Sequence, residues 1–231
     1  MDIKTIELKK TILEDNDKDA DLLREQLRQT KTYYVNLMSS PGSGKTTTLV
    51  ATIKALQDGD VEGGADSGLK IGVMEADIDS DVDAYTIYEK TGAPAVQLHT
   101  GGMCHLDAEM SRQGLREIEH EKLDLVFLEN VGNLVCPAEF DTGAHTKAVI
   151  LSVPEGDDKP LKYPLMFEEA DVVLVTKIDA MEAFDFDPQR FRENLAGVNP
   201  DAPVFFLSGV TGEGVAEWAE WLREKVTQFP A

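Results

Sequence analysis

The run of small and polar residues at 39–47 has the spacing of a phosphate-binding loop. It lies between an apolar segment that predicts a strand, residues 33–38, and a segment of helical periodicity, residues 48–56. In such a unit, backbone N–H groups surround phosphate oxygens, Lys45 reaches the β- and γ-phosphates, and the Thr46 hydroxyl binds Mg²⁺. The residues expected to hold the phosphates are Gly42, Ser43, Gly44, Lys45, Thr46 and Thr47. The sequence therefore predicts a nucleoside triphosphate site, although Ser39 stands where the consensus motif has its first glycine.

Two carboxylates come shortly after apolar segments, where phosphate-loop enzymes place the groups that sense Mg²⁺ and the γ-phosphate. Asp77 and Glu129 are these residues, and we expect them to share Mg²⁺ with Thr46 and to form the catalytic set with Lys45. For the acidic cluster around Asp77, the alternative is that it caps the helix that begins near Val82. Glu129 stands where Asp is usual, so the alternative to direct coordination is action through water or on the nucleophile.

The segment 176–179 resembles the N-K-x-D element with which GTPases recognise guanine, with Thr176 in place of the Asn. The Asp179 carboxylate can accept hydrogen bonds from N1–H and the 2-amino group of guanine, and adenine offers neither donor there. The Lys177 stem can lie against the base, and the loop that contains Ser208 is expected to close over it through backbone N–H groups. The sequence therefore predicts GTP and GDP as ligands.

Cys104, His105 and Cys136 form a second candidate site. Two thiolates and an imidazole suit Ni²⁺ or Zn²⁺, and three ligands leave a coordination position open. Cys136 also lies on the segment that continues from Glu129. The alternative is that each cysteine is a small buried hydrophobe, the commoner fate of free Cys. The remaining histidines are expected to be ordinary surface or loop residues: His99, His120 and His145.

The chain has 231 residues, enough for one α/β domain, and a formal net charge of −21, which argues against nucleic acid or an anionic membrane as partner. It has no apolar run long enough to span a bilayer and no signal-peptide core, so we expect a cytoplasmic protein without a structural disulfide. Nearly continuous apolar segments alternate with helical patterns, which predicts a mostly parallel central sheet with helices on both faces. The expected strands are 33–38, 70–74, 95–98, 124–128, 147–151, 171–175 and 203–207, and the expected helices include 48–56, 106–122, 188–196 and 213–227.

The first 30 residues predict an amphipathic helical arm with an interruption near 15–17, ahead of a phosphate-loop GTPase domain at 31–231. The arm packs on the domain or docks a partner protein; the sequence leaves both roles open. Residues 58–68 are rich in Gly and Asp and predict a surface loop.

Several segments closely resemble HypB, the family of nickel-insertion GTPases that act in hydrogenase maturation and belong to the SIMIBI class. The segments that carry the resemblance are 39–46, 104–108, 129–137, 155–164 and the region 176–179. The resemblance implies nickel or zinc binding at Cys104, His105 and Cys136, and a homodimer that forms with GTP. It also implies delivery of Ni²⁺ to the large subunit of [NiFe]-hydrogenase together with a HypA-like nickel chaperone that docks at the N-terminal arm.

On this basis we expect the nucleotide state to move the Glu129 segment, and with it Cys136 and the dimer face, so that hydrolysis releases nickel. Lys159 or Lys162 is a candidate to reach across the dimer.

Three alternatives to this function remain. The sister urease and cobalamin metallochaperone GTPases are close, but the urease branch is expected to separate its Cys and His by a proline. A ParA/MinD-like ATPase would need a lysine early in the phosphate loop, and a passive metal-binding protein would have a vestigial nucleotide site.

Overall fold

The apolar segments form one parallel sheet in the computed structural model, which describes residues 8–58, 68–78 and 80–229. Within these residues the sheet has seven strands in the order β3-β2-β4-β1-β5-β6-β7, all paired in parallel. The strands are β1 (Tyr33–Ser39), β2 (Ile71–Asp77), β3 (Ala95–His99), β4 (Leu125–Glu129), β5 (Thr146–Ser152), β6 (Val172–Thr176) and β7 (Val204–Phe206). The strand order changes direction at β1, so functional groups are expected at the carboxyl ends of β1 and its neighbours.

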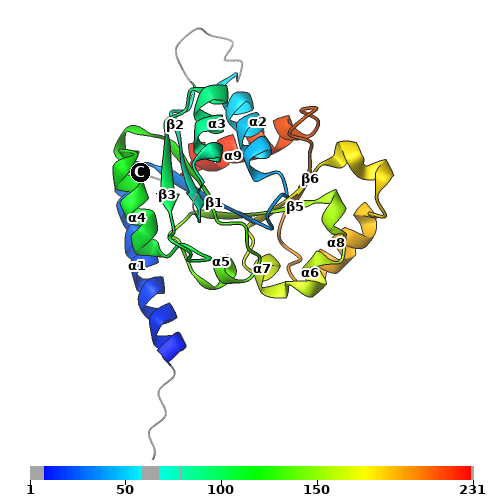
Figure 1. The fold of residues 1–231 in the computed structure, drawn as a ribbon, viewed down its shortest axis with the longest axis horizontal. Coiled ribbons are helices and arrows are strands. Elements are labelled where there is room, and N and C mark those ends of the chain that lie inside the picture. Colours follow the sequence, from blue (N-terminus) through cyan, green and yellow to red (C-terminus); the bar gives the residue numbers. More distant parts are fainter. Residues whose placement is uncertain (1–7, 59–67, 79, 230–231) are drawn as a thin grey trace, which may run out of the picture.

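Helices cover both faces of the sheet (Figure 1). They are α1 (Leu8–Thr30), α2 (Lys45–Gln57), α3 (Val82–Thr91), α4 (Ala108–Glu117), α5 (Cys136–Glu139), α6 (Lys159–Lys162), α7 (Pro164–Glu168), α8 (Pro188–Ala196) and α9 (Val215–Gln228). One face packs against α2, α3 and α9. The opposite face packs against α1 and α4 on one half and against α7 and α8 on the other half. The predicted fold class, a parallel α/β sheet covered on both sides, is confirmed.

All seven predicted strand segments form strands, but two helical predictions are wrong in detail. The helix expected over 106–122 is interrupted because Glu119 adopts a left-handed φ of 54°, so that α4 ends at Glu117 and a short 3₁₀ turn (His120–Lys122) follows. No break occurs near 15–17, since α1 is continuous from Leu8 to Thr30. The side chain of Asn16 bonds to other segments instead of competing with the helix backbone. Residues 1–7 of the arm and 59–67 of the expected loop lie outside the described residues.

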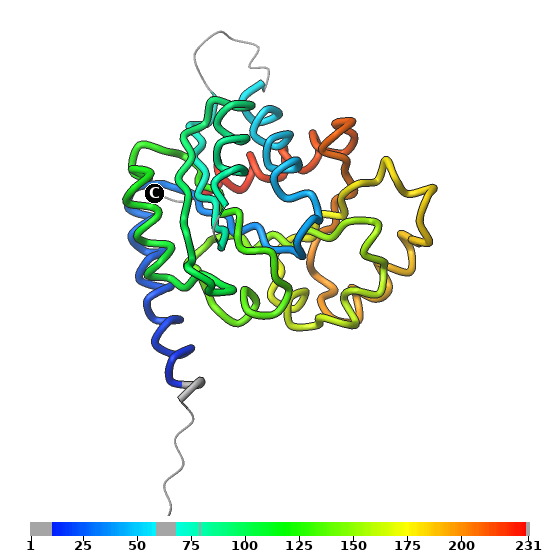
Figure 2. The backbone as a smooth tube through the Cα atoms, in the orientation of Figure 1, coloured from blue at the N-terminus to red at the C-terminus, as the bar shows by residue number. Residues whose placement is uncertain are grey.

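Helices α1 and α4 lie side by side although they are far apart in the sequence, as the tube in Figure 2 shows in blue and green. Leu23 and Leu27 of α1 are buried against Leu115 of α4 and against sheet residues. The first turns of α1 extend beyond the sheet (Figure 1). The arm therefore packs on the body of the protein along its C-terminal half.

His145, expected to be an ordinary surface or loop residue, is half-buried and packed between aromatic rings. Its ring stacks on Tyr33 with centroids 5.3 Å apart and meets Phe229 edge-on at 4.4 Å. The Nδ1 atom accepts a hydrogen bond from the backbone N–H of Tyr34 at 3.1 Å.

Among the described residues, no helix has the combination of length and apolarity that crossing a bilayer requires.

Candidate nucleotide and metal sites

The phosphate loop connects the end of β1 to the start of α2, as the sequence predicts. Gly42 and Gly44 have φ values of 73° and 91°, a backbone conformation that favours glycine and turns the chain sharply into the helix. Ser39 is buried, and its hydroxyl accepts a hydrogen bond from the Ser43 hydroxyl at 2.6 Å while it donates to the Ser40 carbonyl. The serine in place of the consensus glycine therefore braces the loop internally.

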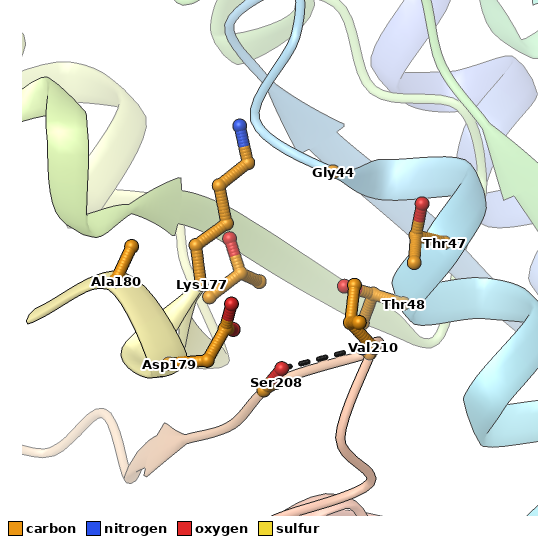
Figure 3. Close-up of a pocket in the computed structure, with 10 residues that line it drawn as sticks. Gly44, Thr47, Thr48, Lys177, Asp179, Ala180, Ser208 and Val210 are labelled. Atoms are coloured by element: carbon orange, nitrogen blue, oxygen red, sulfur yellow. Dashed lines mark hydrogen bonds between the residues drawn. The ribbon is translucent and has the colours of Figure 1, made fainter.

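Beside this loop is a cavity of about 170 Å³ between the ends of β6 and β7 and the start of α2. Figure 3 shows Lys177 and Asp179 on one side of it, Ser208 below and Thr47 and Thr48 on the other side. It is lined by Gly44, Thr47, Thr48, Thr176, Lys177, Asp179, Ala180, Ser208, Gly209 and Val210. The predicted base-recognition residues are thus brought together, and a carboxylate stands next to an apolar-walled space of a size suited to a flat ring.

The residues around this cavity are tied to the phosphate loop by hydrogen bonds. Thr176, which replaces the Asn of the N-K-x-D element, donates its hydroxyl to the Ser43 carbonyl at 2.7 Å. The Lys177 ammonium donates to the Gly42 carbonyl at 2.7 Å. The Ser208 hydroxyl accepts from the N–H groups of the two residues that follow Gly209, at 3.2 Å each. Thr176 therefore links the base loop to the phosphate loop.

A cluster of three carboxylates lies on the other side of the phosphate loop. Thr46 donates its hydroxyl to Glu129 Oε1 at 2.8 Å, and Glu129 Oε2 has no hydrogen-bond partner although the side chain is 2% exposed. Glu75, the direct neighbour of Glu129 in the sheet, and Asp83 of α3 bring carboxylate oxygens within 4.8 Å of one another and of Glu129. Because an unpaired buried carboxylate oxygen is costly, the arrangement suits a divalent cation bound beside the Thr46 hydroxyl.

Burial raises the pKa values of the two acids in this cluster that lie on strands. The pKa of Glu129 is raised from 4.5 to about 7, chiefly by burial and against the opposing effect of the Lys45 ammonium. Burial likewise raises the pKa of Glu75 to about 8, although Gln97 donates a hydrogen bond to its carboxylate. Both groups therefore take up protons readily when no cation is bound.

Asp77, the predicted Mg²⁺ ligand, lies at the end of β2 and accepts a hydrogen bond from the backbone N–H of Ser80 at 3.1 Å. The phosphate side of the loop forms a second cavity, lined by Gly42, Gly44, Lys45, Thr46, Thr47, Asp83, Glu129 and Lys177. Asp77 is not among these lining residues, and its role in Mg²⁺ binding stays a prediction. Sequence reasoning missed Glu75 and Asp83. Asp83 lies in the first turn of α3, just beyond the acidic stretch around Asp77 for which the sequence leaves helix capping as the alternative.

Cys104, His105 and Cys136 come together at one end of the protein, with their donor atoms within 4.8 Å of one another. The Cys104 thiol lies 2.7 Å from the Cys136 sulfur, and both thiols are free. This hydrogen bond to Cys136 raises the pKa of the Cys104 thiol, and burial lowers the pKa of His105. The His105 ring stacks on Phe140 at 3.7 Å between centroids. Two sulfurs and a neutral imidazole form a donor set that fits Ni²⁺ or Zn²⁺.

A short segment connects the acid cluster to this sulfur site. It begins at Glu129, passes the phosphate loop and reaches Cys136 at the start of α5. At Gly132 it lies so close to the loop that an added Cβ would sit 3.0 Å from the backbone of Pro41. The segment that leads from Glu129 to Cys136 is therefore in packing contact with the phosphate loop.

The comparisons with known proteins identify the family of this chain. The model of the CobW/HypB/UreG nucleotide-binding domain matches residues 33–206. The hydrogenase/urease maturation factor HypB of Helicobacter hepaticus is 41% identical over 229 residues, covering 97% of this chain and 90% of its own length. This chain is a HypB-type member of the CobW/HypB/UreG family. The hydrogenase maturation factor HypB of Escherichia coli is 39% identical over 95% of this chain and 72% of its own length.

Solved HypB structures share the fold over almost the whole chain. The crystal structure of Helicobacter pylori HypB in complex with nickel superposes with a TM-score of 0.83 and 36% identity, covering 94% of this chain and 98% of that one. HypB of Archaeoglobus fulgidus gives a TM-score of 0.80 at 35% identity, covering 92% of this chain and 98% of that one. The signal recognition particle receptor FtsY of Elizabethkingia anophelis, at a TM-score of 0.57 and 16% identity, shares the fold alone. The family and the nucleotide-binding fold that the sequence predicts are confirmed.

Proposed function

We propose that this HypB-type protein hydrolyses GTP and carries nickel for the maturation of [NiFe]-hydrogenase, with metal binding coupled to the nucleotide. The observation that carries the proposal is the placement of Cys136 on the segment that runs from Glu129 past the phosphate loop. A passive metal-binding protein with a vestigial nucleotide site would have no need for this connection, nor for a complete phosphate loop beside a base cavity.

Guanine is the base that best suits the cavity at the ends of β6 and β7. Asp179 lines this cavity and supplies a negatively charged acceptor that suits the N1–H and 2-amino donors of guanine. Lys45 and the loop N–H groups would hold the phosphates, with Thr46 and Glu129 as the nearest groups to Mg²⁺ and Asp77 as a further candidate. Mg²⁺ would neutralise the negative charge that develops on the phosphates while the γ-phosphoryl group is transferred to water.

In the mechanism, the nucleotide state acts through Glu129. Thr46 and Glu129, which are joined by a hydrogen bond, would hold Mg²⁺ beside the γ-phosphate of bound GTP, and the charge at this place would change once the phosphate leaves after hydrolysis. Glu129 and the following segment then shift against the phosphate loop, and Cys136 shifts with them. Nickel is the cargo: Cys104, His105 and Cys136 bind it in one nucleotide state and release it in the other.

The partners that we propose follow from the family. The metal site is partly exposed, which allows a second copy of the chain to face it in a GTP-dependent homodimer, with Lys159 or Lys162 as candidates to reach across. A HypA-like nickel chaperone would dock at the first turns of α1, and the hydrogenase large subunit would receive the metal in the cytoplasm. The name of the H. hepaticus relative includes urease, so a urease role is the second candidate function.

The test is Ni²⁺ affinity and dimer mass with GDP and with a non-hydrolysable GTP analogue, for the wild type and for Cys136→Ala. We expect the nucleotide to change both quantities in the wild type, and we expect Cys136→Ala to lose the metal response while it keeps GDP binding. If the nickel affinity is the same with either nucleotide and in Cys136→Ala, the metallochaperone proposal is wrong and only the GTPase proposal remains.

A further inference from the structure

One buried side chain of helix α1, Asn16, contacts both segments that carry the candidate metal ligands. Asn16 is 9% exposed and makes two hydrogen bonds, both to backbone atoms of other segments. Its Nδ2 donates to the carbonyl of Asp141 at 2.9 Å, and its Oδ1 accepts from the N–H of Ala108 at 3.0 Å. Ala108 follows the ligands Cys104 and His105 at the start of α4, and Asp141 follows Cys136 two residues beyond the end of α5. One amide group therefore joins the two segments that carry the three metal ligands.

We propose that Asn16 is a positioning residue for nickel, which sets the distance between the Cys104–His105 segment and the Cys136 segment before the metal binds. The inference rests on the proposed function, because it concerns the same metal site.

The need for such a residue follows from the backbone on the approach to the ligands. Gly101 and Gly102, just before Cys104, have φ values of 62° and 98°, and this stretch is exposed. Glycine carries the largest conformational freedom of any residue, so an unsupported ligand segment would lose that freedom each time a metal binds. A bridge that is already formed in the free protein removes this cost and raises metal affinity.

The bridge also controls the imidazole ligand. Phe140, on which the His105 ring stacks, directly precedes Asp141, whose carbonyl accepts from Asn16. The stacking thus depends on the relative position of the two joined segments. A second polar connection, from Asn133 Nδ2 to the Cys104 carbonyl, is longer at 3.4 Å.

Neighbouring contacts fix Asn16 in place. Arg24, two turns further along α1, donates to both carboxylate oxygens of Asp141 at 2.6 Å and to the Ala144 carbonyl at 3.0 Å. Arg112 of α4 donates to the Asp19 carbonyl at 3.1 Å. With α1 held on both sides, the amide of Asn16 has little freedom to follow a displaced segment, so it acts as a fixed reference point.

The experiment compares Asn16→Ala with the wild type and with Thr52→Val as a matched destabilised control. Thr52 of α2 accepts a hydrogen bond from Trp218 Nε1 at 3.1 Å, in the core on the opposite face of the sheet. Its replacement lowers the melting temperature without touching either metal-bearing segment. Ni²⁺ affinity is measured by competition with a chromophoric chelator, together with the thiolate-to-nickel charge-transfer absorption, GDP affinity and the melting temperature.

We expect Asn16→Ala to weaken Ni²⁺ binding on the order of tenfold or more, as loss of an outer-shell support does, and to change the charge-transfer spectrum. GDP affinity should stay at the wild-type value in both variants. If Asn16→Ala binds Ni²⁺ within twofold of Thr52→Val, with the wild-type spectrum, Asn16 is only structural and the inference is wrong. If Cys136→Ala abolishes Ni²⁺ binding in the same series, the proposed metal site is supported whatever the result for Asn16. If the wild type shows no thiolate-to-nickel absorption, both the proposed metal site and the role of Asn16 are wrong.

Discussion

Replacing Glu129 by Gln should stabilise the nucleotide-free protein while it removes the response to Mg²⁺. Burial raises the pKa of Glu129 from 4.5 to about 7, so the folded state binds the proton more tightly than the unfolded state does. The associated stability is fully present below pH 4.5 and is lost as the pH rises through 7. At about 1.4 kcal/mol per pH unit, ionisation of this group costs the folded protein about 3 kcal/mol at pH 8.

The neutral Gln side chain avoids that cost and still offers an oxygen to the Thr46 hydroxyl. Its amide N–H groups would face the carboxylates of Glu75 and Asp83, whose oxygens lie within 4.8 Å. We therefore expect Glu129→Gln to be more stable than the wild type by about 3 kcal/mol at pH 8, with little difference at pH 4.5.

The assay is urea unfolding of both proteins at pH 4.5, 6 and 8, without nucleotide and with GDP and Mg²⁺. In the wild type, Mg²⁺ with GDP should restore the stability that is lost at pH 8, because the cation compensates the buried charge; in the variant this gain should disappear. A variant that is less stable than the wild type at pH 8 without nucleotide would refute the reasoning. It would show that the Glu129 carboxylate is already compensated in the free protein.

Two further predictions concern the base cavity and the aromatic cluster around His145. Asp179→Asn should weaken GDP binding at least about 100-fold, because the acceptor loses its charge and one of its two oxygens is replaced by an N–H group that faces a guanine donor. Fluorescent GDP titration measures this, and near-wild-type affinity would exclude Asp179 from base recognition. Burial lowers the pKa of His145 to about 4, so its stabilising effect is present above pH 6.5 and is lost as the pH falls to 4, by about 3 kcal/mol. The wild type should therefore exceed His145→Gln in unfolding free energy by less at pH 4.5 than at pH 7. An equal difference at the two pH values would contradict the predicted role of His145.

The sequence predicts the sheet well because each strand is a nearly continuous apolar run, which few other structures can accommodate. The phosphate loop, the base element and the Cys–His–Cys set are predictable for a related reason: their residue types are rare in these combinations. Glu75 was not predicted as part of the acid cluster, since its partner Glu129 becomes its neighbour only through the pairing of β2 with β4. The spacing of residues in the sequence does not show which residues of β2 and β4 are paired.

Asn16 illustrates a different limit of sequence reasoning. The Asp15–Asp17 stretch has the composition of a helix break, because short polar side chains compete with the helix for backbone hydrogen bonds. Here the Asn16 amide finds its partners on Ala108 and Asp141, far away in the sequence, and the helix stays continuous. A local propensity is overridden by long-range contacts that only the folded chain creates.

The structure explains why a glycine, Gly132, follows Glu129. An acid that closes an apolar strand and is followed by a glycine is typical of the segment that senses the γ-phosphate in phosphate-loop enzymes. The structure gives the steric reason for the glycine: a side chain at Gly132 would press on the backbone of Pro41 in the phosphate loop. Because a packed contact of this kind leaves little gap to absorb movement, we expect a displacement of the loop to reach the segment that ends at Cys136. The same close approach that disfavours a side chain at Gly132 is therefore what would let the nucleotide act on Cys136.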